Sequence, residues 1–121
     1  MLFRSVGIVW EPFSEERLAE ARKAGPVFID FTAEWCANCV ANEKLVLNTK
    51  PIAEAFKEKR VTTLVADWTD FDPAITVWIK SFQRIGVPVY VLYLPGSSEP
   101  IVLSEILTQS VVLRHLAEIK N

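Results

Sequence analysis

Residues 27–39 read VFIDFTAEWCANC and contain both cysteines of the chain, Cys36 and Cys39. The start of this stretch is β-branched or aromatic at nearly every position, which predicts a central strand over 27–32 that is buried on both faces. A helical pattern follows, from about Cys36 to Leu47. A Cys-x-x-Cys motif at the junction of a strand and a helix predicts a redox-active dithiol.

The position of each cysteine predicts its role in disulfide exchange. Cys36 lies at the expected helix N-terminus, whose unpaired N–H groups and dipole stabilise a thiolate, so we expect Cys36 to be the nucleophile. Cys39 follows one turn later and is expected to resolve the mixed disulfide. The alternative is a pair of buried structural cysteines that happen to be close, which the junction, the spacing and the adjacent Trp35 disfavour.

Length and composition limit the classes of function that fit the chain. Its 121 residues, half of them hydrophobic, suit one globular domain. A net charge of −2 without a basic cluster disfavours nucleic-acid binding. No apolar run approaches the roughly 18 residues of a membrane span. Residues 1–10 lack a signal-peptide pattern, which leaves open a cytosolic protein, a mature exported protein or a domain of a longer chain.

Cysteine and histidine, the usual ligands of structural zinc, are few in this sequence. Two cysteines and one distant histidine, His115, cannot supply the roughly four ligands of a structural zinc site. We therefore expect no bound metal and no cofactor other than the redox-active Cys36–Cys39 disulfide itself.

The order of the expected elements predicts a three-layer α/β sandwich, with a mixed central sheet flanked by helices. Residues 1–12 are expected to form a lead-in, with an edge strand at 7–10, and residues 13–121 a single domain. The expected helices are 14–25, 36–47, 51–59, 73–83 and one that Thr108 caps, and the expected strands after 27–32 are 61–66, 89–94 and 101–103.

Two acidic residues lie at positions that suggest a role at the dithiol. Asp30 interrupts the apolar strand, where a buried carboxylate costs several kcal/mol unless it is paired, neutralised or useful. We expect it beneath the active-site helix near Cys39, relaying a proton, and the alternative is a hydrated or capped strand-end residue. Glu43 shares a helix face with both cysteines, where its charge would raise thiol pKa values. The alternative for Glu43 is a solvated side chain.

Three further residues are candidates for substrate binding. Pro88 follows Val87 just before an expected strand. A trans proline would simply begin the strand, whereas a cis proline would present the backbone of Val87 to an extended peptide beside the dithiol. Trp35 either packs in the core or shields the dithiol at its rim. The residues alone fit both alternatives.

Several short motifs carry a family resemblance. Residues 30–39 together with Gly86-Val87-Pro88 resemble the thioredoxin superfamily, and a narrower resemblance over about residues 10–119 is to the C-terminal domain of the thiol:disulfide interchange protein DsbD family. The motifs behind the narrower resemblance are 27–33 (VFIDFTA), 42–44 (NEK), 66–69 (ADWT), 72–76 (DPAIT), 86–93 (GVPVYVLY) and 105–108 (EILT).

This resemblance implies a thioredoxin-like sandwich with protein-disulfide reductase activity. In the family the dithiol corresponds to Cys36 and Cys39, and the acids before and after it correspond to Asp30 and Glu43. The cis proline of the superfamily corresponds to Pro88. Val40 departs from the family, which commonly has a basic residue there, so the local charge differs.

The resemblance also implies a place in a longer chain. Family members hold this domain in the periplasm, tethered to the bacterial inner membrane. A membrane-embedded electron-transfer domain supplies its electrons, which pass to a periplasmic acceptor domain and on to isomerases and cytochrome c maturation proteins. We therefore expect an excised, monomeric domain whose partners are protein thiols and disulfides.

Two other functions remain open from the sequence. One is a free-standing thioredoxin-like oxidase or isomerase, which differs from a reductase in its reduction potential. The other is a copper-handling module that uses Cys36 and Cys39 as soft ligands. No Met or His lies near the pair in sequence, which disfavours metal handling. The intact cysteine pair disfavours a redox-silent interaction domain.

Overall fold

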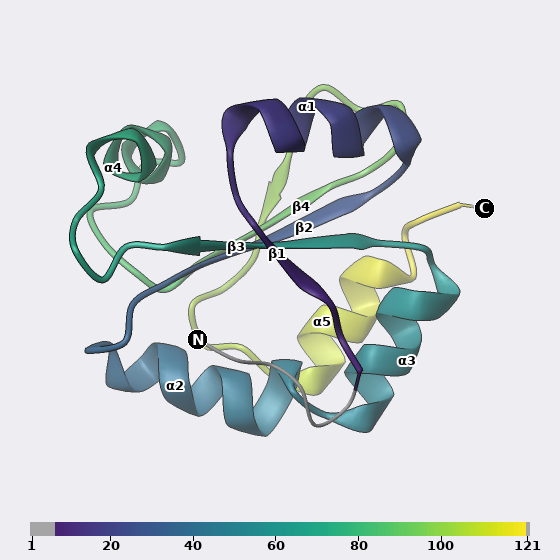
Figure 1. Cartoon of the computed structure of the whole chain (residues 1–121). Helices are drawn as coiled ribbons and strands as arrows, with labels where there is room; N and C mark the ends of the chain where they lie inside the picture. The colour runs from purple at the N-terminus through teal and green to yellow at the C-terminus, as the bar shows by residue number, and fades with distance from the viewer. Residues whose placement is uncertain (1–6, 121) are drawn as a thin grey trace.

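A computed structural model describes residues 7–120, in which five strands form one mixed sheet (Figure 1). The order across the sheet is β1-β3-β2-β4-β5. Strands β1, β3 and β2 are parallel to one another, β4 is antiparallel to β2, and β5 is antiparallel to β4. The strands are β1 (Trp10–Pro12), β2 (Val27–Thr32), β3 (Thr62–Asp67), β4 (Val89–Tyr93) and β5 (Ile101–Val102). Every residue of the central strand β2 is buried, as its sequence predicts.

Helices cover both faces of this sheet, so the predicted three-layer sandwich is confirmed. In Figure 1, α1 and α4 lie above the sheet, and α2, α3 and α5 lie below it. The helices are α1 (Glu15–Ala24), α2 (Ala37–Asn42), α3 (Lys50–Glu58), α4 (Pro73–Ser81) and α5 (Gln109–Leu116).

Three helix starts follow directly from residue types that favour the N-cap position. Ser14 accepts a hydrogen bond from the backbone N–H of Arg17 at 2.9 Å. Asp72 does the same for the first turn of α4, and Thr108 for that of α5. Each side-chain oxygen satisfies a backbone N–H that has no partner within its helix.

Two expected elements differ in detail. The helix predicted over 36–47 is α-helical only to Asn42 and continues as a π-helical turn over Glu43–Leu47, in which the N–H of Asn48 bonds to the carbonyl of Glu43 at 2.7 Å. The edge strand predicted at 7–10 begins later, because Trp10 to Pro12 pair with β3. Residues 1–6 of the expected lead-in, and Asn121, lie outside the described residues.

Alternation along β2 sends its side chains to two separate cores. Val27, Ile29 and Phe31 pack into the cluster that includes residues of α1 and α4. Phe28 packs into the cluster that includes residues of α3 and α5. By the same alternation, Asp30 and Thr32 face the layer of helices that contains α2.

Candidate active site

Cys36 and Cys39 form a disulfide where the chain enters α2. Cys36 is the N-cap residue of this helix, and its Sγ accepts a hydrogen bond from the N–H of Cys39 at 3.1 Å. Cys36 is 8% exposed, whereas Cys39 is completely buried. Of the two cysteines, only Cys36 therefore has a surface that solvent can reach.

The loop before β4 borders the disulfide. The Val87–Pro88 peptide bond is cis, and the carbonyl oxygen of Val87 lies 3.9 Å from the Sγ of Cys36. The side chain of Val87 packs against the small buried cluster of Ala33, Cys36 and Cys39. The structure thus brings Val87 and Pro88 to the dithiol, although they lie about fifty residues further along the chain.

Trp35 lies at the rim of the site. The sequence had left open whether this side chain packs in the core or lies at the rim of the dithiol. Its side chain is 52% exposed, and its indole N–H donates a hydrogen bond to the carbonyl of Thr69 at 2.9 Å. The Thr69 hydroxyl accepts from the N–H of Glu34 at 2.9 Å and donates to the carboxylate of Asp67. Thr69, which the sequence analysis did not single out, thus ties the loop after β3 to the loop that enters the Cys-x-x-Cys motif.

Removing the Thr69 hydroxyl should loosen this connection. Thr69→Val keeps the shape of the side chain but leaves the Glu34 N–H without its acceptor, so we expect the free energy of unfolding to fall by about 1 kcal/mol. Thr69→Ser, which keeps the hydroxyl, is the matched control. Urea unfolding followed by tryptophan fluorescence measures the change, and equal stability of the two variants would contradict this role.

Asp30 is a fully buried carboxyl group on the α2 side of β2. Within residues 7–120, neither of its oxygens has a hydrogen-bond partner. Burial raises the pKa of Asp30 well above its ordinary value, and the nearby carboxylate of Glu43 raises that pKa further. Asp30 is therefore inclined to hold a proton where an exposed aspartate would not.

Glu43 faces the sheet at the start of the π-helical turn. Its Oε2 accepts a hydrogen bond from the hydroxyl of Thr32 at 2.8 Å. Partial burial raises the pKa of Glu43, and the bond from Thr32 acts in the opposite direction. Glu43 is thus held against β2 beside Asp30, and the alternative of a freely solvated helix-face residue is wrong.

Tyr90 and Asn42 extend this polar cluster. Tyr90 is the partner of Asp30 across the β2–β4 pair. Its hydroxyl accepts a hydrogen bond from the side-chain amide of Asn42 at 2.9 Å, and burial together with Asp30 raises its pKa. Asn42 also donates to the carbonyl of Glu105 at 3.1 Å, which fixes the end of α2 against the loop before α5.

The cluster contains residues that the sequence analysis missed. Thr32 was detectable in principle, because it lies two residues after Asp30 and therefore on the same face of the strand. Asn42 and Tyr90 carry no such local signal, since they are hydrogen-bonded to each other across 48 positions. The bonds that join Thr69 to Glu34 and Trp35 likewise span 35 and 34 positions.

Comparison with known proteins places these features in a family. A family model described as thioredoxin-like matches residues 9–95, which include the Cys36–Cys39 pair and the Val87–Pro88 bond. The chain belongs to the thioredoxin-like family. Its Cys-x-x-Cys disulfide lies at the start of a helix, as the sequence predicted.

Two curated relatives of this thioredoxin-like domain are much longer proteins. Thiol:disulfide interchange protein DsbD 1 of Pseudomonas aeruginosa is 34% identical over 83 residues, which cover 68% of this chain and 14% of that protein. DsbD of Klebsiella pneumoniae is 29% identical over 79 residues, covering 65% of this chain and 13% of that protein. The chain therefore spans only a small part of the relatives that it matches.

Solved structures confirm the predicted thioredoxin-like fold. The C-terminal domain of Neisseria meningitidis DsbD in the reduced form superposes with a TM-score of 0.68 at 19% identity, covering 88% of this chain and 97% of that one. A thioredoxin from Thermus thermophilus gives a TM-score of 0.70 at 18% identity, covering 92% and 85%. The chain is a thioredoxin-like domain that resembles the C-terminal domain of DsbD.

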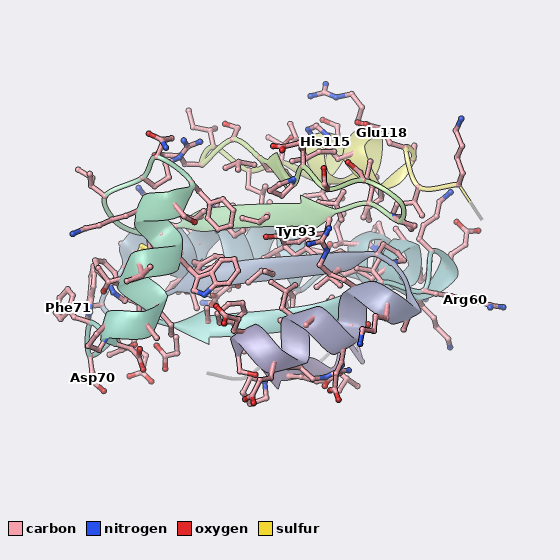
Figure 2. The ribbon with its side chains drawn as sticks, turned by 90° about the horizontal axis from the view of Figure 1, so that it is seen from above. Arg60, Asp70, Phe71, Tyr93, His115 and Glu118 are labelled. Carbon is pink, nitrogen blue, oxygen red and sulfur yellow. A yellow bond between two sulfur atoms is a disulfide. The ribbon has the colours of Figure 1, made fainter. Side chains whose placement is uncertain are left out.

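Membrane-spanning helices and metal-binding clusters are both absent from the part of the domain that the structure describes. No helix within residues 7–120 is long and apolar enough to cross a membrane. Over the same residues, no three His, Cys, Asp or Glu side chains gather to hold a metal ion. His115 instead contacts Glu118 at 3.1 Å, far from the edge of the molecule that carries Phe71 (Figure 2).

Proposed function

We propose that this domain is a protein-disulfide reductase that relays electrons by dithiol–disulfide exchange within a longer, DsbD-like protein. One observation carries the proposal: Cys36 keeps a small exposed surface, its sulfur accepts the N–H of Cys39 and lies beside the backbone of Val87, and Cys39 is completely buried. This asymmetry gives one cysteine the role of nucleophile and the other the role of resolving thiol.

The exchange proceeds in two steps. In the reduced domain, the thiolate of Cys36 attacks a disulfide of the partner, so that a Cys36–partner bond forms and one partner thiol leaves. Cys39 then loses its proton and attacks the sulfur of Cys36, which forms the Cys36–Cys39 disulfide and releases the second partner thiol. Two electrons and two protons pass from the domain to the partner.

Four other residues serve these steps in our proposal. The buried side chain of Asp30, in its ionised form, takes the proton of Cys39 in the second step, and its raised pKa makes that carboxylate a stronger base. Burial raises the pKa of Asp30, and the nearby charge of Glu43 raises it further. The backbone of Val87, set by Pro88, pairs with an extended segment of the partner. Two observations support these roles: Val87 packs against the cysteine pair, and Glu43 lies close enough to Asp30 to raise its pKa after burial has done so.

Similarity to the DsbD proteins supports a cellular role as well. We propose a domain in the bacterial periplasm, tethered to the inner membrane through the rest of its chain. Its donor would be a membrane-embedded electron-transfer domain, and its recipient a periplasmic acceptor domain that serves isomerases and cytochrome c maturation. Both partners meet the domain through thiols or disulfides.

The reduction potential of the Cys36–Cys39 pair tests the reductase role. We expect a value nearer to that of thioredoxin, about −270 mV, than to the roughly −120 mV of a strong periplasmic oxidant. Titration against glutathione and dithiothreitol buffers, with alkylation of the reduced fraction, gives the value directly. Tryptophan fluorescence is a second readout, because Trp35 adjoins Cys36. A reduction potential near −120 mV would contradict the reductase proposal and favour a free-standing oxidase or isomerase.

A further inference from the structure

Phe71 has a backbone conformation that a bulky residue adopts at a cost. Its φ is +57°, in the left-handed region. Arg60 and Gln83 also have positive φ, but each follows the C-cap of a helix, where this conformation is common. Phe71 instead ends a turn that its own N–H closes onto the carbonyl of Trp68 at 3.0 Å. Glycine would be the natural residue there.

Burial in the core does not account for a phenylalanine at this position. The side chain is 57% exposed and projects outward at the edge of the molecule (Figure 2). Its contacts are aromatic: the ring stacks on Trp35 with centroids 5.5 Å apart and planes 25° apart, and meets Trp68 edge-on at 4.9 Å. The three rings form one cluster, which we call the aromatic platform.

The aromatic platform is fixed beside the reactive sulfur. Trp35 adjoins Cys36 and is held by its hydrogen bond to Thr69. On the other side, Trp68 lies against the loop before Pro88, since a Cβ placed on Gly86 would lie 3.6 Å from its ring. The platform therefore extends from the approach to Cys36 toward the loop that presents Val87.

The position of the disulfide determines what can lie on this platform. A partner must bring its own sulfur to Cys36, because Cys39 is completely buried. The residues that flank the partner's cysteine then pass beside Trp35 and Phe71. Two aromatic residues that are each about half exposed at that place favour an apolar neighbour over a polar one.

We propose that Phe71 is a specificity-determining residue, and that the aromatic platform binds an apolar side chain next to the reactive cysteine of the partner protein. This inference rests on the proposed reductase function. Phe71 contacts the flanking side chain of the partner and takes no part in the transfer of the disulfide. The strained backbone at Phe71 holds its ring against Trp35, where the flanking side chain arrives.

Two disulfide-bonded peptides that differ only in the residue beside the cysteine, leucine or serine, test this proposal. For the reduced wild-type domain, we expect a higher kcat/KM with the leucine peptide. Phe71→Gly should lower kcat/KM for that peptide about tenfold, mainly through KM, and change the value for the serine peptide less than twofold. Phe71→Tyr, which keeps an aromatic ring, should retain the preference.

Thermal unfolding separates this role from a structural one. Glycine adopts a positive φ without strain, which offsets the lost ring contacts with Trp35 and Trp68, so Phe71→Gly should stay folded and unfold at a temperature close to that of the wild type. An unchanged leucine-to-serine ratio in Phe71→Gly would overturn the inference and leave the reductase function intact. Failure of the wild-type domain to reduce either peptide would instead overturn the reductase function, and the inference with it.

Discussion

Cys39→Ser should accumulate a mixed disulfide between Cys36 and a partner protein in most of its molecules. In this variant Cys36 can still attack the partner, but no thiol remains to resolve the adduct. Cys36→Ser should trap only a small fraction, because Cys39 is completely buried under the start of α2 and meets no partner directly. The contrast follows from the different burial of two cysteines that are only three positions apart.

A non-reducing gel after incubation with disulfide-containing partner protein measures the trapping. The double variant Cys36→Ser/Cys39→Ser is the control for association without a covalent bond, and addition of dithiothreitol should release every true adduct. Equal trapping by the two single variants would reject the assignment of Cys36 as nucleophile.

Local sequence patterns predicted the sheet, its central strand and the helix starts well. The apolar run of β2 marks a strand covered on both faces, and Ser14, Asp72 and Thr108 mark helix starts by the chemistry of their side chains. These features depend on residues that are neighbours in sequence, so the amino-acid sequence of one protein is sufficient to predict them. The cysteine pair belongs to the same class, because its spacing and its position at a helix start are both local.

Two features made by distant contacts were not predicted. The change from α to π geometry at Glu43 coincides with its hydrogen bond to Thr32, a contact across eleven positions of sequence. The connection between Thr69 and Trp35 joins two loops that are neighbours only because β2 and β3 are adjacent in the sheet. Such contacts follow from the assembled fold, and residue types alone do not specify them.

Asp30→Asn should make the oxidised domain more stable, by an amount that grows with pH. In the unfolded chain Asp30 loses its proton near pH 3.9, whereas burial, and then Glu43, raise its pKa in the folded domain. Between these two pKa values the folded state binds more protons, so the stability of the wild type falls as pH rises through that window. Asparagine does not titrate, and the gain should therefore increase by up to about 1.4 kcal/mol per pH unit.

Urea unfolding at a series of pH values from 4 to 8 measures this gain with the disulfide intact. Glu43→Gln is the matched control: Glu43 also has a raised pKa, but it is only partly buried and Thr32 stabilises its charge, so its gain should be smaller. A constant difference between Asp30→Asn and the wild type over the whole series would show that Asp30 is already ionised in the folded domain.

The same variant should be slower in the second step of exchange. A carboxyl whose pKa is raised toward the working pH can accept the proton of Cys39, and asparagine cannot, so we expect resolution of the mixed disulfide to slow about a hundredfold. Acid quenching and alkylation at early times should then reveal much more of the adduct in Asp30→Asn than in Glu43→Gln, in which Asp30 remains to accept the proton. Higher stability combined with slower resolution is the result expected of a buried acid kept for proton transfer. If Asp30→Asn is more stable yet resolves as fast as the wild type, another group takes the proton of Cys39.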